Sequence, residues 1–171
     1  MGQAMGRLMI ASASPVLAHL DTHILIWLYH KPERAWPEQV LDLLGTGMLR
    51  YSPMARLELY YLHQIGRINV LPAELLSELT EPLCLRECDQ SFSAVIGQAQ
   101  SLTWTRDPFD RLIVAQAMAA KAKLITHDEN IPIRHGLQTL VIFPSHTYGR
   151  MNGGVGRLVI GSVVVHAVIN P

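Results

Sequence analysis

Apolar residues follow two spacings along this chain, one typical of buried strands and the other typical of helices. Short apolar runs between polar residues fit strands covered on both faces, and apolar residues three or four apart fit amphipathic helices. The pattern predicts strands at residues 15–21, 49–52, 83–88, 123–126 and 137–143. It predicts helices at residues 22–30, 37–45, 54–66, 72–79, 90–102 and 107–122. Because strands and helices alternate, we expect an α/β fold in which a parallel sheet of about five strands lies between helices on both faces.

The composition fits one domain with a sizeable core. The chain has 171 residues, of which 49% are apolar. Fourteen Lys and Arg balance fourteen Asp and Glu, so the net charge neither supports nor excludes a nucleic-acid ligand. Two cysteines, Cys84 and Cys88, are too few for a zinc site or a disulfide scaffold, and we expect them to be ordinary thiols in a reducing compartment.

The two ends of the chain differ from the regular alternation between them. Residues 1–15 contain an apolar run too short for a signal peptide, and we expect a flexible extension there. Residues 16–148 carry the alternation and are expected to form the domain. Residues 149–171 begin with glycines and continue with an apolar stretch that fits a strand or a hairpin of unassigned role. No run is long enough to cross a membrane, so we expect a cytoplasmic protein.

Two aspartates follow expected strands at the same edge of the sheet. Asp21 ends the first strand, and Asp128 comes two residues after the strand at 123–126. Ligands of open parallel sheets bind beyond the carboxyl ends of the strands, where both side chains should lie. Either aspartate alone fits a helix cap or a turn. The pair is more indicative of a site.

Glu58 lies among apolar residues within its expected helix. The apolar residues at helical spacing from it are Met54, Tyr61, Leu62 and Ile65. This spacing predicts that the carboxylate lies on the inward stripe of the helix. An ionised glutamate there needs a metal ion, a buried arginine or backbone donors.

The segment "DPFDR" holds two aspartates for which we expect different roles. Asp107 precedes Pro108, the favoured first residue of a helix, so Asp107 should be the N-cap. Asp110 shares its helix face with Ile113, Val114 and Ala117. We therefore expect Asp110 to point inward, as Glu58 does.

Four such acids suit a divalent metal. Mg²⁺ and Mn²⁺ prefer oxygen ligands and take their remaining coordination from water and phosphate. One or two ions could activate water and stabilise the leaving oxygen of a phosphodiester. The sequence therefore predicts metal-assisted phosphodiester hydrolysis.

Four segments resemble successive motifs of the PIN-domain ribonucleases, specifically the VapC-like toxins of bacterial toxin–antitoxin pairs in their "DPFDR" subgroup. They are "LDTHILIWL", "SPMARLELYYLHQIGRI", "RDPFDRLIVAQA" and "KLITHDENI", and the similarity spans residues 16–143. The resemblance implies a PIN-like three-layer fold. It implies that the catalytic metal ligands are Asp21, Glu58, Asp110 and Asp128. It also implies supporting hydroxyls at Thr22 and Thr126 and an accessory acid at Asp107.

The same resemblance implies an activity and partners. It implies an endoribonuclease that uses one or two Mg²⁺ or Mn²⁺ ions to cut RNA, leaving a 5′-phosphate. A small antitoxin protein and a homodimer are the implied partners.

From the sequence itself, Arg111 fits a phosphate contact or a salt bridge with an adjacent helix, and both stay open.

Two other functions fit part of the pattern. Hydrolases of the haloacid dehalogenase type also place an aspartate after a first strand, but they need a second acid two residues later, where this chain has His23. A non-catalytic PIN-like module that binds RNA or protein would keep the same fold. The presence of all four acids favours the nuclease.

Overall fold

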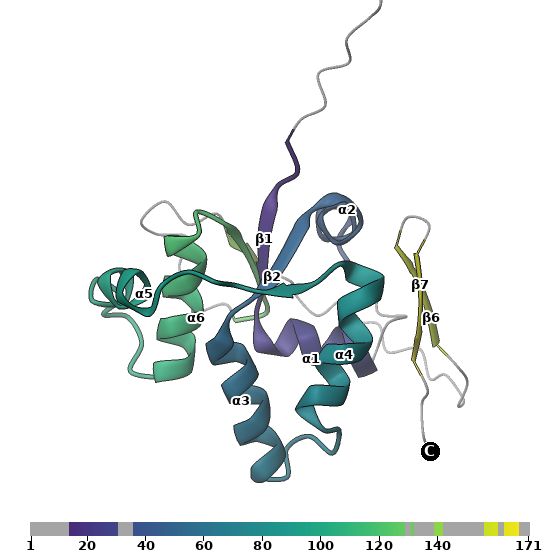
Figure 1. Ribbon diagram of the computed structural model, residues 1–171, viewed down its shortest axis with the longest axis horizontal. Coiled ribbons are helices and arrows are strands. Elements are labelled where there is room, and N and C mark those ends of the chain that lie inside the picture. Colours follow the sequence, from purple (N-terminus) through teal and green to yellow (C-terminus); the bar gives the residue numbers. More distant parts are fainter. Residues whose placement is uncertain are drawn as a thin grey trace, which may run out of the picture.

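Strands and helices alternate along the described part of the chain, as Figure 1 shows. The computed structural model describes residues 14–30, 36–128, 131, 139–141, 156–160 and 163–167. The strands of the main sheet are β1 (Leu17–Leu20), β2 (Met48–Tyr51), β3 (Arg86–Glu87), β4 (Lys123–Thr126) and β5 (Thr139–Val141). The helices are α1 (Thr22–His30), α2 (Glu38–Thr46), α3 (Pro53–Gln64), α4 (Pro72–Leu83), α5 (Phe92–Ala99) and α6 (Pro108–Ala119). Two further strands, β6 (Gly156–Ile160) and β7 (Val163–Ala167), lie near the C-terminus.

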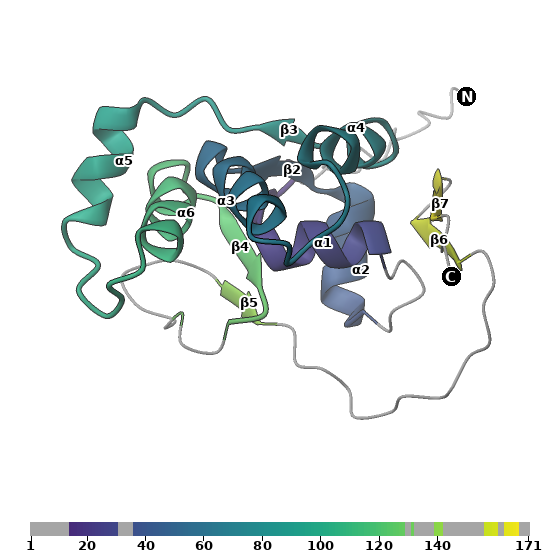
Figure 2. The ribbon, with the colours of Figure 1, turned by 90° about the horizontal axis from the view of Figure 1, so that it is seen from below.

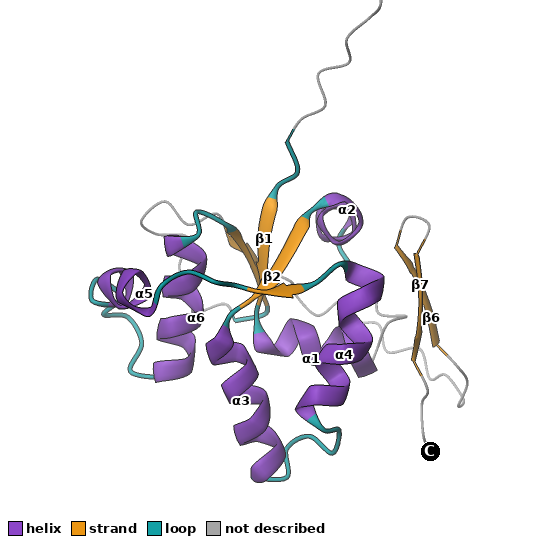
Figure 3. Ribbon diagram, viewed as in Figure 1, coloured by secondary structure: helices purple, strands orange, loops and turns teal. Residues whose placement is uncertain are grey.

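The main sheet is parallel, with its strands in the order β3-β2-β1-β4-β5. The central strand β1 pairs with β2 from Leu17↔Met48 to Leu20↔Tyr51, and with β4 on its other side. Helices α5 and α6 lie on one side of the sheet, and α2 and α4 lie on the other (Figures 1 and 3). This arrangement confirms the expected α/β fold with helices on both faces of a parallel sheet.

The core consists of aliphatic side chains from the central strands and from the helix faces that cover them. Fully buried members include Leu20, Ile24, Leu25, Leu59, Leu75, Ile113, Leu124 and Ile125. Strands β1 and β4 and helices α1, α3 and α6 all contribute to this one cluster. The core therefore fixes these helices relative to the ends of the two strands.

Helix α2 ends later than its sequence suggests. The expected end was Gly45, but the helix continues to Thr46, and the N–H of Gly47 donates to the carbonyl oxygen of Leu43. A Cβ at Gly47 would lie 2.5 Å from that oxygen, so a side chain does not fit there. The glycine that ends the helix is therefore Gly47.

Helix α4 is also longer than the expected range of 72–79. It continues to Leu83 and includes Pro82 in its last turn, where the missing N–H removes a single backbone bond close to the end. Cys84 then takes a left-handed conformation with φ of 47° and closes the helix. Since the helix occupies part of the strand expected at 83–88, that strand is reduced to β3.

The C-terminal strands pair with each other. β6 and β7 form an antiparallel hairpin from Gly156↔Ala167 to Ile160↔Val163, beside α2 and α4. Of the two expected forms, this is the hairpin, and it remains separate from the main sheet. The flexible extension expected at residues 1–15 falls almost wholly outside the described residues. Within the described ranges, no helix is long and apolar enough to span a bilayer.

His19 is a buried polar residue within β1. It is 1% exposed, and neither ring nitrogen has a hydrogen-bond partner among the described residues. Burial, with a further contribution from the charge of Arg50 on β2, lowers the pKa of His19 to about 4. The imidazole is therefore neutral near pH 7.

Candidate functional site

The candidate site lies at the carboxyl ends of β1 and β4. Seen from below in Figure 2, helices α6 and α1 lie on the two sides of β4. Asp21 directly follows β1, and its N–H donates to the carbonyl oxygen of Ile125 at 3.0 Å, which ties the two strand ends together. Asp128 follows β4 by two residues, and its N–H donates to the Thr126 hydroxyl at 3.0 Å. The structure thus places Asp21 and Asp128 at the same edge of the sheet.

Both carboxylate oxygens of Asp21 are held by hydrogen bonds. The backbone N–H of Thr22 donates to Oδ1 at 2.7 Å, and the Thr126 hydroxyl donates to Oδ2 at 2.6 Å. Asp21 is only 7% exposed. Burial raises its pKa and the negative charge of Asp128 adds to this rise, while the two hydrogen bonds oppose it.

Glu58 joins the same network through Thr22. The buried Thr22 hydroxyl donates to Oε2 of Glu58 at 2.6 Å. Burial, and then the charges of Asp21, Asp110 and Asp107, raise the pKa of Glu58 to about 7 although this hydrogen bond opposes the rise. A group with this pKa is close to half-protonated at neutral pH.

The stripe that predicts the direction of Glu58 is partly buried, because Met54 and Leu62 are half-buried and pack against the core. Ala55 and Leu59 form the buried face of α3, whereas Tyr61 and Ile65 are 47% and 49% exposed. Glu58 lies at the border of the buried face, next to Leu59. Spacing therefore placed Glu58 beside the core, where it reaches Thr22, but it did not identify Tyr61 and Ile65 as exposed.

The two aspartates of "DPFDR" take the predicted positions. Asp107 is the N-cap of α6, and its carboxylate accepts a hydrogen bond from the N–H of Phe109 at 2.7 Å. Asp110 lies in the first turn on the face that buries Ile113, Val114 and Ala117. Burial, followed by the charges of neighbouring acids, raises the pKa of Asp110 to about 6. Those acids, in decreasing order of effect, are Asp107, Asp128 and Asp21.

Arg111 makes a contact that the sequence did not suggest. Its Nη2 donates to the backbone carbonyl oxygen of Thr105, and its Nε is buried without a partner among the described residues. The salt bridge expected as one alternative is not formed within the described part of the chain. The guanidinium instead closes the loop that precedes α6.

Thr105 is a site residue that sequence reasoning missed. It is 9% exposed, and its hydroxyl accepts from the N–H of Asp107 at 3.1 Å and donates to Oδ2 of Asp110 at 3.4 Å. The sequence does contain one indication of this role, because Thr105 lies two residues before a helix cap, where threonine commonly bonds to the local backbone.

The acids lie close enough to repel one another. Repulsion from Asp21 contributes to the raised pKa of both Glu58 and Asp110. Among the described residues, no Lys or Arg forms an ion pair with any of these three acids, and the nearby Arg56 binds Glu87 at 3.1 Å. A set of carboxylates and hydroxyls of this kind fits a hard divalent cation.

The positions of these side chains fit a metal ion less well than their chemical types do. In the ranges that the structure describes, no three Asp, Glu, His or Cys side chains converge in a way that could hold a metal ion. A Mg²⁺ ion is usually held by one or two protein carboxylates together with several waters, so it does not need three of these side chains to converge.

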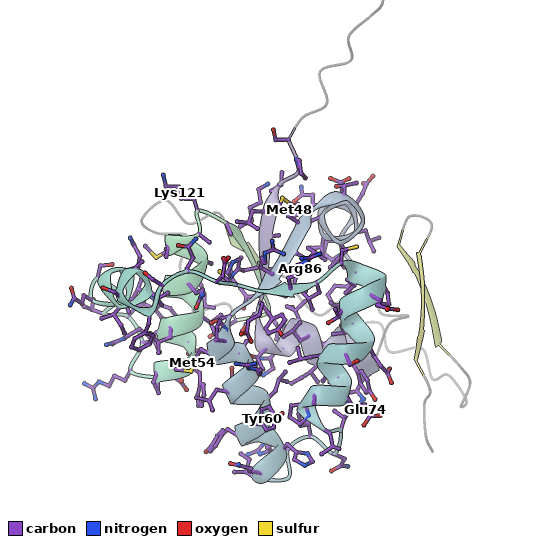
Figure 4. The ribbon with its side chains drawn as sticks, in the orientation of Figure 1. Met48, Met54, Tyr60, Glu74, Arg86 and Lys121 are labelled. Atoms are coloured by element: carbon purple, nitrogen blue, oxygen red, sulfur yellow. The ribbon has the colours of Figure 1, made fainter. Side chains whose placement is uncertain are left out.

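A separate apolar hollow of about 340 Å³ lies between α3, α5 and α6. Its walls include Met54 and Leu57 of α3, Phe92 of α5 and Leu112 of α6. Figure 4 shows Met54 on the side of α3 that faces α6. None of the four candidate acids lines this hollow, so it is distinct from the acidic site.

The sequence matches a known protein family, and the fold is similar to that of solved structures. The model of the PIN domain matches residues 18–135. The fold is similar to that of VapBC2 from Rickettsia felis bound to a DNA fragment from its promoter, with a TM-score of 0.56 and 16% identity over 74% of this chain and 98% of that chain. For VapBC-1 from nontypeable Haemophilus influenzae the TM-score is 0.52, with 21% identity over 72% and 96% of the two chains. For DNA-bound VapBC from Salmonella typhimurium the TM-score is 0.51, with 16% identity over 74% and 98%. No protein of curated function matches the sequence.

Proposed function

Because this chain belongs to the PIN-domain family, we propose that it is a metal-dependent endoribonuclease of the VapC-like "DPFDR" subgroup, acting in the cytoplasm. The proposed reaction is hydrolysis of an RNA phosphodiester bond. The proposed ligands of one or two Mg²⁺ or Mn²⁺ ions are Asp21, Glu58, Asp110 and Asp128. The observation that carries this proposal is the meeting of these acids at one sheet edge, where their charges and their burial raise the pKa of Glu58 and Asp110.

Threonine hydroxyls prepare the acids for this role. When bound, the metal would supply an activated water and charge stabilisation for the leaving oxygen. Thr126 and the N–H of Thr22 hold the two oxygens of Asp21, and the Thr22 hydroxyl holds one oxygen of Glu58. Donors that bond to ligand carboxylates fix their orientation and favour their ionised form. Thr22 and Thr126 therefore act through the acids that they hold.

An arginine other than Arg111 is better placed to meet RNA phosphate. Arg111 is bound to the Thr105 carbonyl oxygen, and Arg56 is paired with Glu87. Arg106, by contrast, is exposed and directly precedes the accessory acid Asp107. Arg106 is therefore the phosphate contact in this proposal, and its charge would offset the repulsion between RNA and the acids.

A non-catalytic module that binds RNA or protein is the second candidate. The observation in its favour is that no three potential ligands converge on one point within the described residues. Such a module would bind RNA without cutting it, whichever divalent ion is present.

A cleavage assay separates the two candidates. We expect the purified chain, free of any partner, to cut single-stranded or looped RNA in Mg²⁺ or Mn²⁺, and excess EDTA to stop the reaction. Gel electrophoresis of labelled RNA follows the cleavage, and a 5′-phosphate on the product identifies water as the nucleophile. Undiminished cleavage in EDTA would contradict the metal mechanism. RNA binding without cleavage in either metal would favour the second candidate.

A small antitoxin protein is the proposed regulatory partner, and a homodimer is the proposed assembly. The outer part of α3 supports a protein contact because Leu57, Tyr60, Tyr61 and Ile65 are between 42% and 56% exposed. Tyr60 points away from the body of the molecule in Figure 4. An antitoxin segment that covers α3 would bury these side chains and could place a basic residue near Glu58.

Binding of the partner should protect α3 from hydrogen exchange. We expect slower amide exchange along α3 in the complex than in the free chain. Leu57→Asp should weaken binding about tenfold or more because it places a charge in a buried contact. Leu71→Asp is the matched control, since Leu71 is equally exposed, at 58%, but precedes α4. Protection confined to residues 156–167 would mean that the partner binds the hairpin instead.

A further inference from the structure

Thr105, in the loop that leads into α6, contacts three residues at the start of that helix. Its hydroxyl bonds to the N–H of Asp107, which caps the helix, and to the carboxylate of Asp110 in the first turn. Its carbonyl oxygen accepts from Arg111. One buried residue thus contacts the cap, the candidate ligand and the arginine that follows it.

Asp110 needs such a contact more than an isolated aspartate would. It is half-buried, and the charges of Asp107, Asp128 and Asp21 all act against its ionised form. A donor that bonds to the carboxylate favours its ionised form and so opposes the effect of these charges. Among the described residues, Thr105 is the side chain that donates a hydrogen bond to Asp110.

The contact follows a pattern that recurs in the site. The Thr126 hydroxyl donates to Asp21, and the Thr22 hydroxyl donates to Glu58. The Thr105 hydroxyl occupies the corresponding place beside Asp110. In each of these three acids one carboxylate oxygen accepts from a threonine hydroxyl, and in Asp21 the other oxygen accepts from the N–H of Thr22.

We propose that Thr105 is a positioning residue, whose hydroxyl fixes Oδ2 of Asp110 and leaves Oδ1 as the oxygen offered to the metal. This role rests on the proposed function, because it assigns a metal to the acidic site. The bond between Arg111 and the Thr105 carbonyl holds the loop against α6, so the hydroxyl stays within reach of Asp110. Thr105 acts only through Asp110 and does not itself contact the metal or the RNA.

Manganese binding tests this role without relying on activity. Thermal unfolding across a Mn²⁺ titration gives the concentration of half-maximal stabilisation for each variant. We expect Thr105→Val, which is similar in shape but lacks the hydroxyl, to raise that concentration about tenfold. Thr105→Ser keeps the hydroxyl and should bind Mn²⁺ as the wild type does. Thr80→Val is the control, because it removes a hydroxyl bond to the Leu76 carbonyl oxygen of α4 and should leave Mn²⁺ binding unchanged.

The outcomes distinguish this role from a purely structural one. Loss of the bond to Asp107 alone would lower the melting temperature of Thr105→Val in EDTA but leave its Mn²⁺ response unchanged, and that result would overturn the proposal. If Thr105→Val does not fold, Thr105→Ala removes the same hydroxyl with a smaller side chain and is judged by the same criterion. A wild type that does not respond to Mn²⁺ would overturn the proposed metal site, and the role of Thr105 with it. Normal Mn²⁺ binding by the wild type and by Thr105→Val would overturn the role of Thr105 alone.

Discussion

Asp21→Asn should reduce RNA cleavage about a thousandfold or more while the fold is retained. Asp21 follows β1, bonds to β4 through its N–H and is the most buried of the four candidate ligands. An amide is a far weaker ligand for Mg²⁺ than a carboxylate. The amide oxygen can still accept one of the two hydrogen bonds that hold the side chain. Neutralising a buried acid also relieves repulsion from Asp128, so the variant should not be less stable than the wild type in EDTA.

Cleavage rates and circular dichroism of the two proteins, measured side by side, would check this expectation. Asp42→Asn is a suitable control because Asp42 is exposed on α2, outside the network that contains Asp21. It should leave the rate unchanged. A variant at Asp21 that folds and cleaves at the rate of the wild type would remove Asp21 from the mechanism.

Glu58→Gln should stabilise the metal-free chain above pH 7 by about 2 kcal/mol, after allowance for solvent screening of a partly buried group. Burial and the neighbouring acids raise the pKa of Glu58 to about 7, from an ordinary value of 4.5. Between these two values the folded chain keeps a proton that the unfolded chain releases. The Glu58 carboxyl therefore lowers the stability of the wild type progressively as the pH rises from 4.5 to 7. Glutamine carries no charge at any of these pH values and still offers an oxygen to the Thr22 hydroxyl.

Urea unfolding in EDTA at several pH values measures this effect as a difference between the two proteins. The difference in unfolding free energy should grow from near zero at about pH 4.5 to its full size at about pH 8. His19 has the opposite dependence, because its lowered pKa of about 4 reduces stability as the pH falls below 6.5. The wild type and the variant share this loss, so it cancels in the difference. An equal shift at both ends of the pH range would contradict this role of Glu58.

The sequence predicts the fold where neighbouring residues determine it. Apolar runs mark the central strands because both faces of these strands are covered. Asp107 and Pro108 mark the start of α6 because a cap depends on residues within one turn. The inward direction of Asp110 follows from the apolar residues on its own helix face for the same reason.

Features that depend on packing between elements could not be predicted in this way. The buried face of α3 is the one that faces α1, α4 and α6, and nothing in its own sequence distinguishes Leu59 from Tyr61 as a core residue. Thr105 reaches Asp110 only because the preceding loop folds back onto α6. The end of α2 depends on how closely Gly47 approaches the carbonyl oxygens of Leu43 and Val16, and the oxygen of Val16 comes from a distant part of the chain.

The place of β4 beside β1 affects when the acidic site forms during synthesis. The hydrogen bond between Thr126 and Asp21 joins residues 105 positions apart. A growing chain can pair β1 with β2 and form α1 and α3 early, but Asp110 and Asp128 leave the ribosome much later. At about 5–20 residues per second, the first half of the fold is present for several seconds before the acidic site is complete. Under the proposed function, the outer face of α3 is therefore available to the antitoxin before the acidic site is complete, so an inhibitor present during translation would meet the chain before cleavage could begin.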